Sequence, residues 1–152
     1  MMLPGHIVAS SVTAAWFGVT TQSPVGTIAC FLSGIFIDLD HVLDFYIFKK
    51  NLPRSYKELK DFCLDPSGKI YLFLHSYELM AFLWVVVFCF KPSVLFVGLL
   101  FGMSVHLLLD QLTNAIYPLA YFIFYRLKLG FPKVIFFRDQ PVKEIVPTIQ
   151  NP

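Results

Sequence analysis

Charged residues are scarce in this chain. They make up only 14% of its 152 residues, whereas hydrophobic residues make up 57%. A soluble domain averages about 25% charged residues. One domain of this length lacks the interior volume to bury so many apolar side chains. The composition therefore argues against an ordinary soluble domain and favours a chain that lies in a lipid bilayer.

Other absences narrow the functional classes. Cys30, Cys63 and Cys89 show no C-x-x-C spacing, which disfavours a disulfide framework or a thiolate metal site. No G-x-S-x-G sequence surrounds Ser76, so a serine nucleophile is also disfavoured. No Lys or Arg precedes the first apolar run, unlike in a secretory signal peptide. The basic segment 49–69 holds only two aromatic residues and several acids, so nucleic acid is not an expected partner.

Apolar segments separated by polar stretches predict the fold. Residues 70–90, for example, are long enough to cross a hydrocarbon core, which takes about 20 residues. The stretch 114–127 is aromatic and carries Pro118, which predicts a bent or interfacial helix, and KVIFF at 133–137 is expected as a short strand. The predicted fold class is all-α: one membrane-embedded domain over residues 1–152, an integral membrane bundle of about four short transmembrane helices plus the interfacial helix. The predicted transmembrane helices are 7–21, 25–40, 70–90 and 94–112.

The basic residues predict the orientation. Six of the twelve Lys and Arg lie in the loop expected at 41–69, and five more lie from Arg126 onward. With four crossings, both regions share one face with the N-terminus, and the positive-inside rule makes that face cytoplasmic. We therefore expect a multi-pass protein of the inner (cell) membrane, with 41–69 as a basic cytoplasmic loop and 128–152 as a cytoplasmic tail. Membrane lipids are the expected partners.

All four histidines fall at the same, cytoplasmic end of the predicted bundle, and acidic residues accompany them. Glu78 follows His75 by three positions, on one helical face. A charged group in hydrocarbon costs about 2.5–3.5 kcal/mol, which a bound divalent cation would offset. This pattern predicts a metal site near the cytoplasmic face, with a network of ion pairs as the weaker alternative. The candidate ligands are His6, Asp38, Asp40, His41, His75, Glu78, His106 and Asp110.

Glycine spacing supports a site on the last transmembrane segment. Residues at intervals of four share one helical face there: Gly98, Gly102, His106 and Asp110. The G-x-x-x-G part allows another backbone to approach closely, which would bring ligands of other helices within reach. Asp38 and Asp40 point about 200° apart on an ideal helix, so both face one site only if the helix ends or bends there.

The ligand types predict the metal and its chemistry. Imidazole with carboxylate suits Zn best, with Mn or Fe as alternatives, and the number of donors allows one or two ions. We expect a hydrolase that acts on a phosphoester such as a phospholipid through a metal-activated water. Asp40, Asp44 or Glu78 would accept the proton. The alternative is a non-catalytic metal-binding membrane protein: a structural site, a sensor or a transporter. Ligands gathered at one end disfavour transport, because transporter sites lie near the bilayer midplane.

The order of these motifs resembles a known family. GH near the N-terminus, DLDH, HS, and HLLLDQLT followed by Pro118 resemble the predicted membrane-bound metal-dependent hydrolases. That helical family is thought to be distantly related to the zinc-dependent phospholipase C and nuclease superfamily. The resemblance spans residues 6–118, and DLDH and HLLLD are its most specific parts. It implies metal roles for His6, Asp38, Asp40, His41, His75, His106 and Asp110.

The chain departs from the family pattern in two places. Ile37 stands where the family often has Pro before its D-x-D-H. Ile70 and Tyr71 stand where the family often has a His-Arg pair just before the H-S. Glu78, three residues after His75, is the candidate substitute for the missing histidine ligand.

Overall fold

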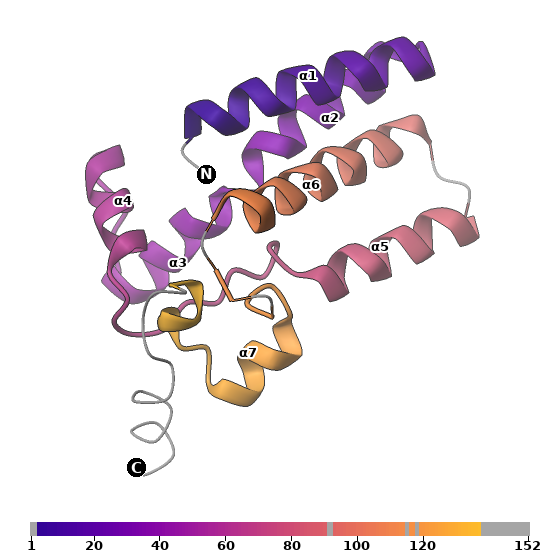
Figure 1. The fold of residues 1–152 in the computed structure, drawn as a ribbon. Coiled ribbons are helices and arrows are strands. Elements are labelled where there is room, and N and C mark those ends of the chain that lie inside the picture. The colour runs from indigo at the N-terminus through magenta and orange to yellow at the C-terminus, as the bar shows by residue number, and fades with distance from the viewer. Residues whose placement is uncertain (1–2, 91–92, 115, 118, 138–152) are drawn as a thin grey trace. The chain divides into compact units, whose positions relative to one another are not determined.

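The computed structural model describes residues 3–90, 93–114, 116–117 and 119–137 (Figure 1). These residues form α-helices and one short 3-10 helix, and no strand occurs among them. The chain divides into two compact units. Unit 1 comprises Met1–Asp38 and Tyr77–Asn114, and unit 2 comprises Leu39–Ser76 and Ala115–Pro152. The all-α prediction is confirmed for the described part of the chain.

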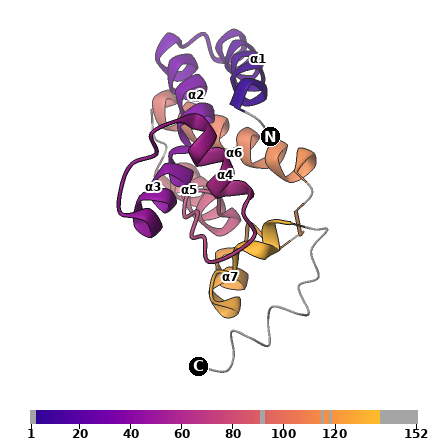
Figure 2. The ribbon, with the colours of Figure 1, turned by 90° about the vertical axis from the view of Figure 1, so that its left-hand side faces the viewer.

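Four helices make up unit 1. Three of them, α1, α2 and α6, lie side by side (Figures 1 and 2), and α5 packs against α6. α2 starts where the sequence signals it, because the Ser23 hydroxyl accepts a hydrogen bond of 3.2 Å from the Gly26 N–H and Pro24 occupies the first turn. The bounds are α1 Leu3–Thr21, α2 Pro24–Phe36, α5 Tyr77–Phe90 and α6 Val94–Thr113.

Glycines let α2 and α6 approach to backbone contact. A methyl group at Gly98 would overlap the Gly26 carbonyl oxygen, and one at Gly102 would overlap the Cys30 carbonyl oxygen. Neither position therefore accepts a larger residue unless the helices move apart. Ala14, Phe17 and Cys30 form a buried cluster beside this contact. The expected close approach along the G-x-x-x-G stripe is present.

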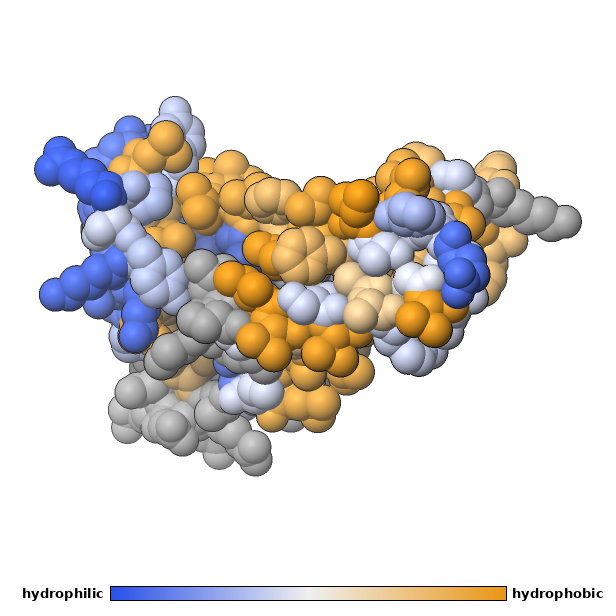
Figure 3. Space-filling model, turned by 90° about the horizontal axis from the view of Figure 1, so that it is seen from above, coloured by the Kyte–Doolittle hydropathy of each residue, from blue (hydrophilic) through white to orange (hydrophobic). Residues whose placement is uncertain are grey.

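The outer surface of unit 1 is apolar. α5 buries only Met80, and Phe82, Val85 and Phe88 on the same helix are exposed by 58–77%. Figure 3 shows hydrophobic residues over much of the face that it views. The sequence of unit 1 has only four charged residues: Asp38, Glu78, Lys91 and Asp110. Such a surface is unfavourable in water and suits an apolar environment.

Two helical stretches are long and apolar enough to cross a membrane. They are Pro24–Lys49, which includes α2 and α3, and Val94–Thr113, which is α6. α5 is apolar but shorter, at 14 residues. The prediction of membrane-crossing helices is therefore supported for two stretches by length and composition, and the predicted bundle of four crossings is not confirmed.

Unit 2 contains helices that the sequence did not predict. The expected loop 41–69 instead contains most of α3 (Leu39–Lys49) and all of α4 (Tyr56–Leu64). α4 has an N-cap at Ser55, whose hydroxyl accepts the Glu58 N–H. The expected interfacial helix 114–127 begins only at Ile123, as α7 (Ile123–Leu129), and ends at Gly130 with a left-handed φ of 77°.

The strand predicted at 133–137 is not present in the structure. KVIFF was expected as a strand, but Lys133–Phe136 is the 3-10 helix η1. Its Lys133 side chain is buried, with Nζ donating to the Phe62 carbonyl at 2.6 Å and lying 3.5 Å from the centre of the Phe62 ring. These contacts fix the segment against α4 instead of against a neighbouring strand. Most of the predicted cytoplasmic tail, residues 138–152, lies outside the described residues.

A buried polar clamp explains why the helix expected at 70–90 begins only at Tyr77. The Asp44 carboxylate accepts the N–H groups of Tyr71 and Leu72 at 2.9 and 3.0 Å. Asp40 accepts those of Leu74 and His75. The guanidinium of Arg126, which is fully buried, donates to the carbonyl oxygens of residues 71, 72 and 75. Backbone groups held this way cannot form the hydrogen bonds of a helix.

Candidate metal site

Four predicted ligands meet within unit 1. His6 lies in the first turns of α1, Asp38 in the turn after α2, and His106 and Asp110 on one face of α6. Each offers a donor atom, and these four atoms all lie within 4.8 Å of one another. The side chains of His6, His106 and Asp110 are only 1–5% exposed, whereas that of Asp38 is 26% exposed. A buried His/Asp group of metal-binding dimensions is therefore present.

The separations within this group fit ligands of one ion. His106 Nε2 lies 3.3 Å from Asp38 Oδ1 and 3.3 Å from Asp110 Oδ2, and His6 Nε2 lies 3.3 Å from Asp110 Oδ1. Charge-assisted N–H···O bonds are shorter, about 2.7–2.9 Å. Two ligands of a tetrahedral zinc ion, with bonds of about 2.0–2.1 Å, are separated by about 3.3–3.4 Å. The spacing thus suits metal ligands better than a compact network of ion pairs.

The hydrogen bond of His106 to the backbone directs Nε2 into this group. Nδ1 lies 2.6 Å from the Gly34 carbonyl oxygen, which can only accept, so Nδ1 must carry the proton. Nε2 of a neutral His106 then presents its lone pair to the two carboxylates, as in a metal-ligating histidine. The His6 ring stacks on that of His106, with centroids 3.9 Å apart. Buried His6 Nδ1 has no hydrogen-bond partner among the described residues, so stacking positions this ring more than hydrogen bonds do.

The charge balance of unit 1 also favours a cation. Asp38 and Asp110 bring two carboxylates into the group, beside two imidazoles that bind an ion in their neutral form. Lys91 is the only Lys or Arg in the sequence of unit 1. A positive charge stabilises carboxylates in a largely apolar unit, and a divalent cation fits both the geometry and the acidic donors of the group.

Three other predicted ligands lie in unit 2. Asp40 and His41 are in the first turn of α3, and His75 lies in the clamped segment before α5. His75 Nδ1 is 3.4 Å from the same Asp40 oxygen that accepts backbone N–H groups. The rings of His41 and His75 have centroids 5.3 Å apart, and His41 Nδ1 contacts Cys63 Sγ at 3.5 Å. In unit 2, therefore, Asp40 mainly orients His75 and its backbone.

The expected proton acceptors occupy three different settings. Asp44 is 1% exposed, and its Oδ2 accepts two backbone N–H groups, so that oxygen is engaged in holding the chain. Asp40 plays the same part in the clamp. Glu78 is half-buried in the first turn of α5 and is not one of the four residues that converge in unit 1.

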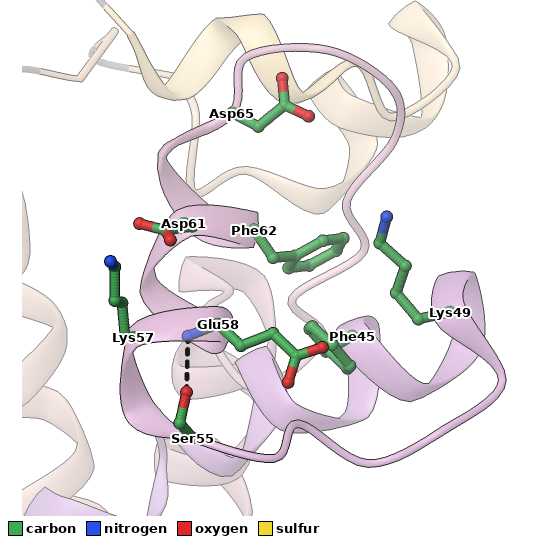
Figure 4. Close-up of a pocket in the computed structure, with 8 residues that line it drawn as sticks. All are labelled: Phe45, Lys49, Ser55, Lys57, Glu58, Asp61, Phe62 and Asp65. Carbon is green, nitrogen blue, oxygen red and sulfur yellow. Dashed lines mark hydrogen bonds between the residues drawn. The ribbon is translucent and has the colours of Figure 1, made fainter.

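A pocket of about 440 Å³ in unit 2 differs chemically from this site (Figure 4). Two of its acids already act locally: Glu58 accepts the Arg54 N–H at 2.7 Å, and Asp65 accepts both the N–H and the hydroxyl of Ser67. The hydrogen bonds from Ser67 lower the pKa of the Asp65 carboxyl. No histidine lines the pocket. Its lining residues are Phe45, Lys49, Ser55, Lys57, Glu58, Asp61, Phe62 and Asp65.

Sequence reasoning missed two residues that support the site and one that supports the clamp. Gly34 contributes its carbonyl oxygen, and no side-chain pattern reveals a backbone acceptor. Asn114 donates to Asp110 at 2.9 Å, and its position four residues after the aspartate was a usable signal. Arg126 lies in a segment assigned to the membrane interface, and its backbone partners are more than 50 residues away.

No family model, curated protein or solved structure matches this chain. The geometry of the site therefore carries the functional argument.

Proposed function

We propose that the protein is a membrane-bound, metal-dependent hydrolase that acts on a phosphoester, with its metal site in unit 1. One observation carries the proposal. Two imidazoles and two carboxylates, three of them buried, converge in a unit whose sequence offers a single Lys and no Arg. Two histidines with a carboxylate form a ligand set that catalytic zinc sites use. The motif order that resembles the membrane-bound metal-dependent hydrolases agrees with this choice.

The difference in exposure among the donors suggests their roles. His6, His106 and Asp110 would hold the ion from the buried side, and Asp38 stands at the accessible side. A divalent ion held there would lower the pKa of a water to about 7 and polarise a phosphoryl oxygen. Gly34 holds His106 in the required tautomer. Asp38 is the exposed carboxylate beside the buried donors and is placed to accept a proton from an attacking water.

The surroundings of the site favour a lipid substrate. Two residues beyond each ligand on α1 and α6, the helix surface is apolar and exposed: Val8 by 65%, Leu108 by 53% and Leu112 by 72%. These outward faces suit contact with lipid at the depth of the ligands. A phosphoester at the headgroup level of a lipid could reach such a site without leaving the membrane. The inner membrane and a cytoplasmic-facing site belong to the same proposal, on the distribution of Lys and Arg.

The test combines metal content with turnover. Detergent-solubilised wild type, His106→Ala and Asp110→Ala are analysed for Zn, Mn and Fe, and the same samples are assayed on phospholipid vesicles and on a chromogenic phosphodiester. Asp61→Ala, which alters an exposed carboxylate on α4, is the matched control. Wild type and control should hold metal and turn over substrate, and both site variants should lose metal and activity. Metal retained in both site variants would refute the ligand assignment.

A non-catalytic metal site is the second candidate, because four protein donors within 4.8 Å could close a tetrahedral ion completely. Substitution of Asp38 distinguishes a structural site from a catalytic one. In a structural site, Asp38→Ala should release the metal and lower stability. In a catalytic site, the three buried ligands should retain the metal while turnover falls. Metal-loaded wild type without turnover on any phosphoester would favour the structural site.

A further inference from the structure

Asn114 stands at the end of α6 and contacts a ligand of the proposed site. α6 ends at Thr113, and the Asn114 backbone N–H donates to the Asp110 carbonyl oxygen at 3.0 Å. The Asn114 side chain turns back along the helix, and its Nδ2 donates to Asp110 Oδ1 at 2.9 Å. The same residue thus holds both the backbone and the carboxylate of Asp110.

The two oxygens of Asp110 face different partners. Oδ1 lies beside Asn114 Nδ2 and, at 3.3 Å, beside His6 Nε2, whereas Oδ2 lies 3.3 Å from His106 Nε2. Rotation of the carboxylate about its Cβ–Cγ bond would break the bond from Asn114. Asn114, which is not itself a candidate ligand, therefore holds one oxygen of the carboxylate in place.

Helix termination alone does not account for this side-chain contact. Asparagine ends helices mainly by adopting the left-handed conformation. Asn114 instead has φ −92° and ψ 137°, an extended conformation that most residues adopt readily. Helix termination therefore makes no special demand on the Asn114 side chain, which donates its amide N–H to Asp110 Oδ1.

We propose that Asn114 is a positioning residue, which holds the Asp110 carboxylate in the orientation that a metal ion requires. The inference rests on the proposed function, because it assumes that Asp110 is a metal ligand. Partners that orient a ligand in this way typically contribute 10–100-fold to metal affinity. The contacts of Asp110 agree with this role, because the Asn114 amide holds Oδ1 and Oδ2 lies beside His106.

The test uses metal affinity and the visible spectrum of bound Co²⁺. Zn²⁺ and Co²⁺ are titrated into chelator-treated wild type, Asn114→Leu and Asn114→Ala, and the unfolding of each metal-free protein is measured. Thr113→Val is the matched control, because Thr113 lies on the exposed side of α6, where its hydroxyl donates to the Leu109 carbonyl oxygen at 2.7 Å. Both Asn114 variants should bind metal roughly 10–100-fold more weakly than wild type and the control, with a changed Co²⁺ spectrum.

Each outcome is decisive. If the Asn114 variants lose metal-free stability but bind metal with the affinity and spectrum of wild type, Asn114 only terminates the helix and the inference is overturned. The alanine variant decides the question if the leucine variant does not fold. Wild type that binds neither ion overturns the proposed function itself, a result distinct from failure of the Asn114 variants alone.

Discussion

Substitution of Gly102 by alanine should weaken metal binding although Gly102 contacts no metal. A methyl group at this position would overlap the Cys30 carbonyl oxygen of α2, and real contacts of this kind essentially never fall under 3.0 Å. To relieve the overlap, α2 and α6 must move apart by about 1 Å, a typical response to overpacking. Gly34 is on α2 and His106 on α6, so their hydrogen bond changes with the same movement.

The magnitude follows from that bond. Its length is now 2.6 Å, and a further 1 Å or so would lengthen it to about 3.6 Å, which is no longer a hydrogen bond. Loss of the bond costs about 1 kcal/mol and overpacking adds about 1–3 kcal/mol, so the free energy of unfolding should fall by about 2–4 kcal/mol. Because His106 loses the acceptor that fixes its tautomer, affinity for Zn²⁺ should fall by about 10–100-fold.

The assay compares thermal unfolding and Zn²⁺ titration of Gly102→Ala with those of Gly18→Ala. At Gly18, a methyl group would meet the side chain of Thr27 and no backbone atom, although relief of that contact disturbs the hydrogen bond of 2.8 Å from the Thr27 hydroxyl to the Ser23 carbonyl oxygen. Some loss of stability is expected in the control, but it leaves the α2–α6 backbone contact intact and should bind metal as wild type does. Gly102→Ala with wild-type affinity for Zn²⁺ would refute the argument that the α2–α6 contact sets the geometry of the site.

Three further predictions concern the clamp, a buried lysine and the metal. Arg126→Met should lower the free energy of unfolding by roughly 3–5 kcal/mol, because three backbone carbonyls lose their donor. Arg126→Lys should recover only part of this loss. A methionine variant whose free energy of unfolding in denaturant lies within about 1 kcal/mol of that of wild type would contradict this prediction. Burial lowers the pKa of Lys133, against the opposing effect of Cys63 and Asp65. The unfolded chain thus binds this proton more tightly, so stability should rise with pH between the lowered pKa and the ordinary value of 10.5. Lys133→Met should show a flatter pH dependence of unfolding, and an unchanged slope would show that Lys133 does not titrate in that range. Finally, chelation should lower the melting temperature of wild type, and free Zn²⁺ at about 100 times its Kd should restore about 2.7 kcal/mol. Asp110→Ala should show no such shift, and an equal shift would place the metal elsewhere.

The helices predicted most accurately are those with local signals. Apolar runs with Ser23-Pro24 and Ser93 before them predicted α2 and α6 nearly to the residue at their starts. α4 was missed because YKELKDFCL is mostly polar and buries no residue fully, so composition alone resembles a loop. The late start of α5 could not be predicted, because Arg126 acts on backbone groups more than 50 residues earlier.

In the candidate site too, features with a local sequence signal were predicted, and features that depend on distant backbone contacts were not. Ionisable residues inside an apolar run are conspicuous, and the spacing of His106 and Asp110 places both on one face of α6. Their meeting with His6 and Asp38 in unit 1 followed from the predicted helix hairpins. The acceptor role of Asp40 and Asp44 was invisible, because acids that bind distant backbone N–H groups look in a sequence like acids that bind a metal.

The two units alternate along the chain, and this has a consequence for biosynthesis. His6 emerges from the ribosome early, but its partners on α6 follow about 100 residues later, after a whole segment of unit 2. At about 5–20 residues per second, the nascent protein spends roughly 5–20 s with an incomplete set of donors. The proposed site can therefore offer its full set of donors to an ion only late in translation, after the apolar helices α1 and α2 have been made.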